Sequence, residues 1–410
     1  MADHHFVPRR LFQLLCLTLL VVGSVTPSLA AVTPKLQGGQ SHSVALKSDG
    51  TVWAWGENGY GGMLGVGSSE WRVMTPTQVP GLSGIIDIAA GGLHTLALRN
   101  DGTVWAWGYN SNGQLGDGTT TDRNTPVQVV GLTGVTSLAA GSYHGLALKS
   151  DGTVWAWGAN SEGQLGDGST TDRKIPVQAV GLSNVTALAG GGYHTLALTG
   201  SGTVWAWGYN GYGQLGDGST LRQSYPAPLS GIGNVTAVAG GWKHSLALKN
   251  DGTLWGWGLN SNGQLGDGST TDRYTPVQVL GLSSVSAMTG GGAGGAVHTV
   301  ALKNDGTVWA WGQNMFGQLG DGSTTNRSIP TQVTGLSGVT SLTAGAVHTL
   351  ALKNDGAVWA WGYNGTGLLG DGTETDRHTP VQVGSFNLTA SAVLSDSDRI
   401  FNYLETAYSV

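Results

Sequence analysis

The chain has 410 residues, of which 70 are glycine, and only 11% are charged, far below the usual quarter of a soluble protein. The formal net charge of −6 leaves no basic excess to match a phosphate backbone, so a nucleic-acid partner is not expected. The only cysteine, Cys16, lies in the N-terminal apolar run. The rest of the chain therefore cannot form disulfides and must be stabilised by its core.

The N-terminus has the three-part pattern of a secretory signal. Arg9 and Arg10 precede an apolar run over residues 11–25, and small residues follow at 28–30. The run is shorter than the ~20 residues that a membrane-spanning helix needs. We therefore predict a signal peptide over residues 1–30 and a product that is secreted, periplasmic or on the cell surface, with no membrane attachment after cleavage.

A repeat of about 50 residues fills most of the remaining chain. Its clearest stretch, residues 144–158, reads HGLALKSDGTVWAWG, and near-copies of it occur seven times. The copies lie 52, 50, 50, 50, 54 and 50 residues apart, measured between His42, His94, His144, His194, His244, His298 and His348. A period of this size, held seven times, predicts one supersecondary unit that is stacked or arranged in a ring. One domain is expected over residues 33–383.

Each copy is predicted to contain four strands. Side chains alternate with period two over 145–149 and 153–158, and Asp151-Gly152 between them is typical of a tight hairpin turn. Two further strands are predicted at 135–140 and 126–130. Four short strands without a helical pattern are typical of a β-propeller blade. We expect the leucine and tryptophan side of each blade to press on the alanine and glycine side of its neighbour, with all fourteen indoles of the Trp pairs buried.

The ends of the repeat region indicate how the ring closes. The first copy has no valine strand before it, whereas the last copy has an additional one at 379–383. One interpretation is that the last copy completes the first blade. A different blade boundary would need no such exchange.

The long loop of each copy carries a family resemblance. Residues 158–168 read GANSEGQLGDG, and a proline, a valine strand, G-x-x-H-x-L-A-L and D-G-x-V-x-x-W-G follow; these elements recur in the same order along the chain. This order resembles the regulator of chromosome condensation repeat family over about residues 33–383. The resemblance implies an all-β, seven-bladed propeller of four-stranded blades. The nuclear member of that family is a guanine-nucleotide exchange factor that docks on nucleosomes, and the secreted bacterial β-lactamase-inhibitor members grip an enzyme with loops of one face.

The repeated polar residues are predicted to be structural. Equivalent positions in a ring lie too far apart for ligation at ~2 Å, so the seven histidines are expected to form hydrogen bonds between strands or blades. The repeated Gly-Asp-Gly is interpreted as a turn rather than a calcium site, and the repeated asparagine, such as Asn160, as a loop clamp. Asp122 and Arg123 are expected to be exposed loop charges. No metal, cofactor or catalytic residue is predicted, and no enzymatic activity.

Aromatic residues at positions that differ between copies are the predicted binding residues, because scaffold-held loops with aromatic side chains are typical binding anchors. They are Tyr60, Trp71, Tyr109, Tyr143, Tyr193, Tyr209, Tyr212, Trp242, Phe316 and Tyr363. The alternative is that they only cover blade edges. We predict a monomeric, secreted, non-enzymatic scaffold that binds a protein, including an enzyme that it inhibits, or a glycan. The alternatives are nucleotide exchange on a GTPase and a propeller lyase or glycosidase.

Two segments depart from the repeat. Residues 290–296 form a glycine-rich insertion in the sixth copy, and we expect it to bulge from the blade tip. The tail at 384–410 has a capping pattern at 395–398 before Ile400 and Leu404, which predicts a short amphipathic helix. This tail is similar to the opening of a small helical module found at the end of many secreted proteobacterial proteins.

Overall fold

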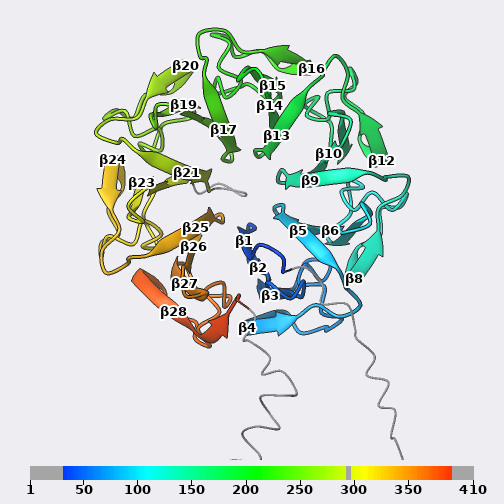
Figure 1. Cartoon of the computed structure of the whole chain (residues 1–410), viewed down its shortest axis with the longest axis vertical. Coiled ribbons are helices and arrows are strands. Elements are labelled where there is room, and N and C mark those ends of the chain that lie inside the picture. Colours follow the sequence, from blue (N-terminus) through cyan, green and yellow to red (C-terminus); the bar gives the residue numbers. More distant parts are fainter. Residues whose placement is uncertain (1–30, 292–296, 390–410) are drawn as a thin grey trace, which may run out of the picture. The chain divides into compact units, whose positions relative to one another are not determined.

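A computed structural model describes residues 31–291 and 297–389 of the chain. Within these ranges the strands form seven four-stranded antiparallel sheets around a common axis, which confirms the predicted seven-bladed propeller (Figure 1). The described part contains no helix, and therefore no helix that is long and apolar enough to cross a bilayer. The predicted signal peptide, the predicted C-terminal helix and residues 292–296 of the glycine-rich insertion lie outside the described residues.

In every blade the strands are consecutive in sequence; the first lies nearest the axis and the fourth on the outer rim (Figure 1). Blades 1 to 4 contain β1 (Lys35–Gly38), β2 (His42–Leu46), β3 (Val52–Glu57) and β4 (Arg72–Gln78); β5 (Ile85–Ala90), β6 (His94–Arg99), β7 (Val104–Gly108) and β8 (Arg123–Gln128); β9 (Val135–Ala140), β10 (His144–Lys149), β11 (Val154–Gly158) and β12 (Arg173–Gln178); β13 (Val185–Gly190), β14 (His194–Thr199), β15 (Val204–Gly208) and β16 (Gln223–Pro228).

Blades 5 to 7 follow the same plan. They contain β17 (Val235–Gly240), β18 (His244–Lys249), β19 (Leu254–Gly258) and β20 (Arg273–Gln278); β21 (Val285–Gly290), β22 (His298–Lys303), β23 (Val308–Gly312) and β24 (Arg327–Gln332); β25 (Val339–Ala344), β26 (His348–Lys353), β27 (Ala357–Gly362) and β28 (Arg377–Asn387). The strand β28 therefore continues past residue 383, where the tail was predicted to begin.

The predicted hairpin turn between the second and third strands is confirmed. In blade 3 the amide of Lys149 donates to the carbonyl of Thr153 at 3.0 Å, and the amide of Gly152 donates to the carbonyl of Lys149 at 2.9 Å. Asp151 closes the turn because its carboxylate accepts hydrogen bonds from the amide and hydroxyl of Thr153. Gly152 has a φ of 77°, a conformation that favours glycine.

The prediction that the leucines and tryptophans of a blade share one face was wrong. Trp157 pairs with Gly145 across the sheet and Trp155 pairs with Ala147, whereas Leu146 and Leu148 pair with Ala156 and Val154. Directly paired residues project to the same side, so each tryptophan stands over a small residue of its own blade. The leucine face of one blade packs on the tryptophan face of the next: a core cluster joins Leu96, Leu98 and Val104 of blade 2 to Ala147 and Trp157 of blade 3.

Half of the paired indoles are fully buried, rather than all fourteen. The second tryptophan of each pair is buried: Trp55, Trp107, Trp157, Trp207, Trp257, Trp311 and Trp361. The first tryptophan, such as Trp155, is only partly buried and lies next to the hairpin turn. There the ammonium of Lys149 lies 5.4 Å from its ring centroid, so this indole forms a cation–π contact as well as packing against the edge of the core.

Polar side chains connect neighbouring blades, and the repeated histidines form most of these connections, as expected from the sequence. In six of the seven blades the imidazole Nε2 lies within hydrogen-bond distance of a hydroxyl on the next blade; the pairs are His42 with Thr95, His144 with Thr195, His194 with Ser245, His244 with Thr299, His298 with Thr349, and His348 with Ser43, at 2.9–3.1 Å. In most blades that hydroxyl also donates to a loop carbonyl. For example, Thr195 donates to the carbonyl of Gln164 at 2.8 Å. The same carbonyl accepts the indole N–H of Trp207 at 2.9 Å.

This arrangement fixes the histidine tautomer. A hydroxyl has one proton, and Thr195 uses it for the carbonyl of Gln164, so Thr195 must accept a proton from Nε2 of His144. Nδ1 of His144 then carries no proton, and this atom has no hydrogen-bond partner among the described residues. Gly141 leaves room for the ring, since a Cβ there would lie 2.0 Å from its Cε1 atom. Burial lowers the pKa of His144 to about 4, so the imidazole is neutral in the folded protein.

Two blade junctions lack part of this bonding. Gly145 occupies the place of the hydroxyl residue in blade 3, and neither nitrogen of His94 has a partner within the described ranges. In the first copy Met63 replaces the loop glutamine, and Nε1 of the buried Trp107 is likewise unpaired there.

The ring closes without exchange of a strand, so the blade boundary is the alternative one. Ser43 of blade 1 bonds His348 at 2.9 Å and the carbonyl of Leu368 at 2.8 Å, both in blade 7. The end of β28 adds to this junction, because the ring of Phe386 packs 5.4 Å from that of Trp53. The amide of Ser48 also donates to the carbonyl of Leu388 at 2.8 Å.

The unpaired indole provides a matched pair of variants. Trp207 and Trp107 are both fully buried, but only Trp207 donates a hydrogen bond. We predict that Trp207→Phe destabilises the protein by about 1–2 kcal/mol more than Trp107→Phe, because only the first substitution removes a buried hydrogen bond. Urea denaturation of the two variants measures this difference. Equal losses of stability would contradict the assigned bonding.

The buried imidazoles predict a loss of stability in mild acid. The pKa of each of the seven histidines is lowered from 6.5 to about 3 or 4, chiefly by burial. The unfolded chain therefore binds more protons than the folded chain between pH 6.5 and about 4. The free energy of unfolding contributed by the neutral imidazoles is fully present above pH 6.5. Between pH 6.5 and the folded-state pKa, each histidine lowers it by about 1.4 kcal/mol per pH unit. Urea midpoints measured across this range check the prediction, and a flat profile down to pH 4.5 would refute it.

Candidate functional site

The strand order divides the connections between two faces of the ring. His144, which begins β10, pairs with Gly158, which ends β11, so the loops that join first to second strands and third to fourth strands lie together. We call this side the loop face, and the side with the turns between second and third strands the hairpin face. Val32 and Leu388, close to the two described ends, bond to Ser48 and Gly356 in hairpin turns. Both described ends therefore lie on the hairpin face.

All the predicted binding aromatics lie in loops of the loop face. Those between first and second strands are Tyr143, Tyr193 and Trp242; those between third and fourth strands are Tyr60, Trp71, Tyr109, Tyr209, Tyr212, Phe316 and Tyr363. Tyr60 and Trp71 are 57% and 54% exposed, and the others are partly buried. The binding role of these residues stays a prediction. Because these residues share the loop face, a partner could contact several of them at once.

Internal hydrogen bonds hold the long loops, and the asparagine clamp is observed. Nδ2 of Asn160 donates to Asp167 and to the carbonyl of Thr171, while its Oδ1 accepts from the amide of Leu165 at 3.0 Å. The amide of Asn160 donates to Asp172 at 2.8 Å. Equivalent bonds surround Asn110, Asn260 and Asn364. The loops therefore present their variable side chains from a fixed backbone.

The side chains of Arg123 and Arg173, expected to be exposed loop charges, are 37% exposed, but each forms an ion pair with a buried aspartate. Nε and one terminal nitrogen of Arg123 bind Asp117 at 3.0 and 2.8 Å, and the side chain of Asp117 is only 3% exposed. Blades 3, 5, 6 and 7 have the same pair. Burial alone would raise the pKa of Asp117, but hydrogen bonds from Thr119 and Arg123 outweigh it and lower the pKa. The neighbouring Asp122 is also bonded, since it accepts from the amide of Asn110 at 2.7 Å.

Four tyrosines from blades 3 and 4 form two contacting pairs, which we call the tyrosine cluster: Tyr143, Tyr193, Tyr209 and Tyr212. The ring centroids of Tyr143 and Tyr193 are 5.6 Å apart, and those of Tyr209 and Tyr212 are 6.3 Å apart. The neighbouring Lys243 places its ammonium 4.5 Å from the ring centroid of Tyr212 and 4.0 Å from that of Trp242. Aromatic side chains of three successive blades thus meet on the loop face.

The pKa values of two tyrosines in the cluster are raised, one in each pair. Burial raises the pKa of Tyr193, and Tyr143 and then Glu162 add to the shift. Burial, Tyr212 and Glu162 likewise raise the pKa of Tyr209. Glu162 thus acts on one tyrosine of each pair. Its carboxylate is 3.7 Å from a terminal nitrogen of Arg222, and the side chains are 29% and 58% exposed.

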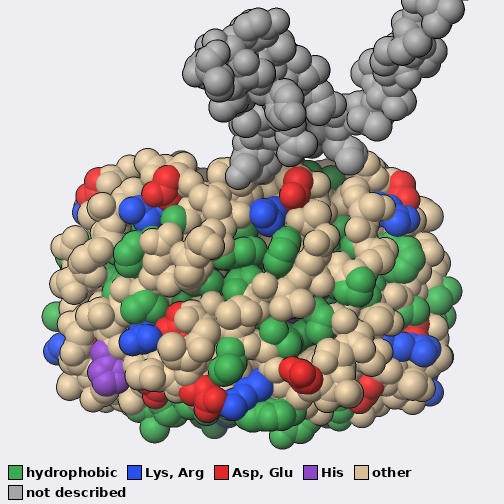
Figure 2. Space-filling view, turned by 90° about the horizontal axis from the view of Figure 1, so that it is seen from below, with side chains coloured by type: hydrophobic (Ala, Val, Ile, Leu, Met, Phe, Trp, Pro, Cys, Tyr) green, Lys and Arg blue, Asp and Glu red, His purple; other side chains and the backbone are tan. Residues whose placement is uncertain are grey.

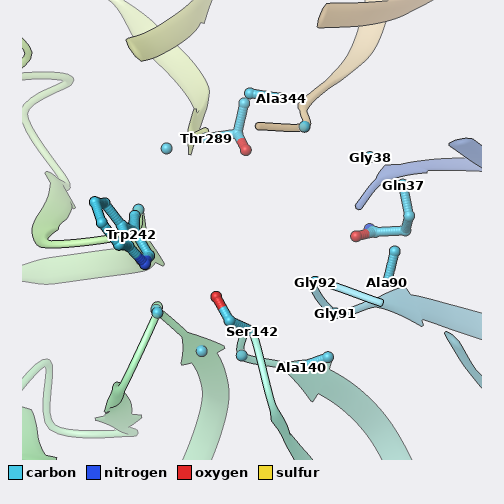
Figure 3. Close-up of a pocket in the computed structure, with 18 of the residues that line it drawn as sticks. Gln37, Gly38, Ala90, Gly91, Gly92, Ala140, Ser142, Trp242, Thr289 and Ala344 are labelled. Atoms are coloured by element: carbon cyan, nitrogen blue, oxygen red, sulfur yellow. The ribbon is translucent and has the colours of Figure 1, made fainter. Parts of the chain in front are cut away.

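A cavity of about 120 Å³ opens on the propeller axis. Figure 3 shows the side chains of Gln37, Ser142 and Thr289 directed toward its centre, with Trp242 at one side. The remaining lining is mainly glycine and alanine from the inner strands. Because Trp242 also contacts Lys243, the axial cavity adjoins the aromatic surface of the loop face.

Charge is distributed unevenly between the two faces. The loops of the loop face and the strand ends that flank them contain 14 acidic residues of the described chain, Glu57, Glu70, Asp117, Asp122, Glu162, Asp167, Asp172, Asp217, Asp267, Asp272, Asp321, Asp371, Glu374 and Asp376. The same regions contain 9 basic residues, Arg72, Arg123, Arg173, Lys174, Arg222, Lys243, Arg273, Arg327 and Arg377. The other described charges balance. Six aspartates in hairpin turns each follow a basic residue, as Asp151 follows Lys149, and the remaining Asp87 is paired with Lys35. Figure 2 shows such acid–base pairs along one rim of the ring.

No group of three or more histidine, cysteine, aspartate or glutamate residues in residues 31–291 and 297–389 is placed to hold a metal ion. The aromatic side chains could be located from the sequence, but the role of Glu162 could not, because its pairing with Arg222 of the next blade has no local sequence pattern. The pairing of the loop arginines with buried aspartates was also missed, although their constant spacing of six residues was a usable signal.

The assignment of Glu162 can be tested by titration. We predict that Glu162→Gln lowers the pKa of both Tyr193 and Tyr209, because it removes a negative charge that opposes formation of the phenolates. Absorbance of tyrosinate as a function of pH measures the shift, and Tyr193→Phe and Tyr209→Phe assign it to residues. Unchanged titration curves would place the carboxylate away from the cluster.

Comparisons with known proteins agree with this architecture. A family model described as the RCC1-like domain matches residues 80–396, and models of the regulator of chromosome condensation repeat match residues 49–98 and 35–61. The human E3 ubiquitin-protein ligase HERC2 is 48% identical over 88 residues, which are 21% of this chain and only 2% of that relative.

Solved structures match over most of the chain. The structure of Kap60 bound to yeast RCC1 (Prp20) gives a TM-score of 0.73 at 26% identity, covering 87% of this chain and 85% of that chain. Human WBSCR16 gives 0.72 at 27% identity, covering 81% and 93%. Since the domain model covers most of the sequence, the chain belongs to the RCC1-like domain family.

Proposed function

We propose that this protein is a secreted, monomeric, non-enzymatic scaffold that binds a protein partner through the loop face of its propeller. The observation that carries the proposal is the placement of all ten predicted binding aromatics on one face, on loops with bonded backbones. Large aromatic side chains on rigid supports lose little conformational entropy on binding and are frequent hot spots of interfaces. The N-terminal pattern at residues 1–30 supports secretion.

Relatives support a binding role in general terms. One structural match is the structure of Kap60 bound to yeast RCC1. We favour a protein over a glycan because the loop face combines aromatic side chains with an excess of acidic groups. Inhibition of an enzyme is the sharper form of this proposal, in which the aromatic loops cover the active site of the partner.

Paired surface variants test the proposal. Tyr143→Ala, Tyr193→Ala and Tyr209→Ala are combined in one loop-face variant, and Lys149→Ala, Lys249→Ala and Lys303→Ala in a hairpin-face variant. We expect wild type and the hairpin-face variant to capture the same protein from the native extracellular medium, identified by mass spectrometry. The loop-face variant should lose it, with affinity reduced at least about 100-fold if each truncation removes 1 kcal/mol or more.

Three outcomes would count against the proposal. Capture by the loop-face variant and not by the hairpin-face variant would assign binding to the other side of the ring. Acceleration of nucleotide release from a candidate GTPase would favour an exchange factor. Turnover of a polysaccharide in an activity screen would favour a lyase or glycosidase. Thermal denaturation of both variants controls for folding.

A further inference from the structure

The net charge of the described chain is confined to the loop face. Its 14 acidic residues exceed its 9 basic residues, whereas acids and bases balance elsewhere. Long-range attraction therefore favours a cationic partner surface on the same side as the aromatic residues.

Within this face, one acidic group lies at the junction of blades 3 and 4, which also carries the tyrosine cluster. Glu162 extends from the long loop of blade 3 to blade 4, where it is paired with Arg222. Arg222 belongs to the long loop that begins with Tyr209, and the amide of Tyr209 donates to the carbonyl of Tyr193 at 2.8 Å. The closest atoms of the Glu162 and Arg222 side chains are 3.7 Å apart, beyond a direct hydrogen bond. Arg222 instead donates to the carbonyl of Ser161 at 3.1 Å. The Glu162 carboxylate, 29% exposed, therefore retains capacity to accept hydrogen bonds from a ligand.

The same surface already holds a cation of this chain. The ammonium of Lys243 lies 4.0 Å from the ring centroid of Trp242 and 4.5 Å from that of Tyr212, and it donates to the hydroxyl of Tyr212 at 3.3 Å. An electron-rich ring face attracts a cation, and a nearby carboxylate adds a charged hydrogen bond. Tyr143, Tyr193 and Tyr209 provide rings at the same junction of blades 3 and 4, without an internal lysine in contact with them among the described residues.

We propose that Glu162 and the tyrosine cluster receive an arginine side chain from a basic segment of a protein partner. This inference rests on the proposed binding function and specifies its chemistry. The guanidinium lies against the phenol rings, because it is planar and weakly hydrated, and donates to the Glu162 carboxylate in place of the loosely paired Arg222. The excess of acidic groups on the loop face attracts the remainder of the basic segment.

The test uses the full chain and synthetic peptides. An arginine-rich peptide, the same peptide with citrulline at every arginine, and a glutamate-rich peptide are titrated into the protein by isothermal calorimetry at low salt. We expect the arginine peptide to bind, with an affinity that falls as salt is added, and the citrulline and glutamate peptides not to bind. Citrulline keeps the shape of arginine but not its charge, so equal binding of the two would overturn the proposal.

Variants locate the interaction. Glu162→Gln should lower the affinity for the arginine peptide at least about tenfold, since a charged hydrogen bond is lost. Glu70→Gln is the matched control, because it removes the same charge from an exposed glutamate of the loop face on blade 1. Arg222→Gln should strengthen binding by freeing the carboxylate. Equal losses for Glu162→Gln and Glu70→Gln would reduce the effect to diffuse electrostatics and refute the specific contact.

Failure of this inference can be distinguished from failure of the proposed function. If the loop-face variant loses its captured protein while Glu162→Gln binds that protein with wild-type affinity, the binding face is correct and the arginine contact is wrong. If neither variant affects capture, the loop face itself is excluded. Circular dichroism and thermal denaturation of Glu162→Gln show whether it remains folded.

Discussion

The structure depends on one bonding pattern between neighbouring blades. A loop carbonyl, such as that of Gln164, accepts both the indole N–H of Trp207 and the hydroxyl of Thr195, and that hydroxyl accepts a proton from His144. Each partner is fully buried, so every bond forms where water cannot compete. The pattern fixes the position of one blade against the next, and its repetition around the ring replaces disulfides as a source of specificity.

The backbone adds a second set of bonds close to the axis. The amide of Ala346 donates to the carbonyl of Gly39, that of Gln40 to Gly92, and that of Gly92 to Ser142, at 2.9–3.1 Å. These bonds connect four blades without using any side chain. Glycine is needed there because the inner loops of neighbouring blades approach each other closely: a Cβ on Gly92 would lie 2.8 Å from the carbonyl oxygen of Ser142. The abundance of glycine in the composition thus reflects crowding at the axis as well as turns.

Much of the fold follows from local patterns, and the remainder depends on pairing. The period of the histidines and the alternation at 145–149 predict seven blades of four strands, because both are properties of one repeat. The side of the sheet that carries Trp157 could not be predicted, since it depends on the register with Gly145, which alternation within each strand does not specify. The same holds for the site: aromatic residues such as Tyr209 stand out by their variability, whereas Glu162 acquires its role only when blades 3 and 4 meet.

The location of the two described ends has a consequence for how the domain can be used. Val32 and Leu388 are both tied to hairpin turns, on the side of the ring away from the aromatic loops. A surface anchor, a linker or an additional module joined at either end would leave the aromatic side unobstructed. The ring can thus be attached through its hairpin face while the loop face stays accessible to a partner.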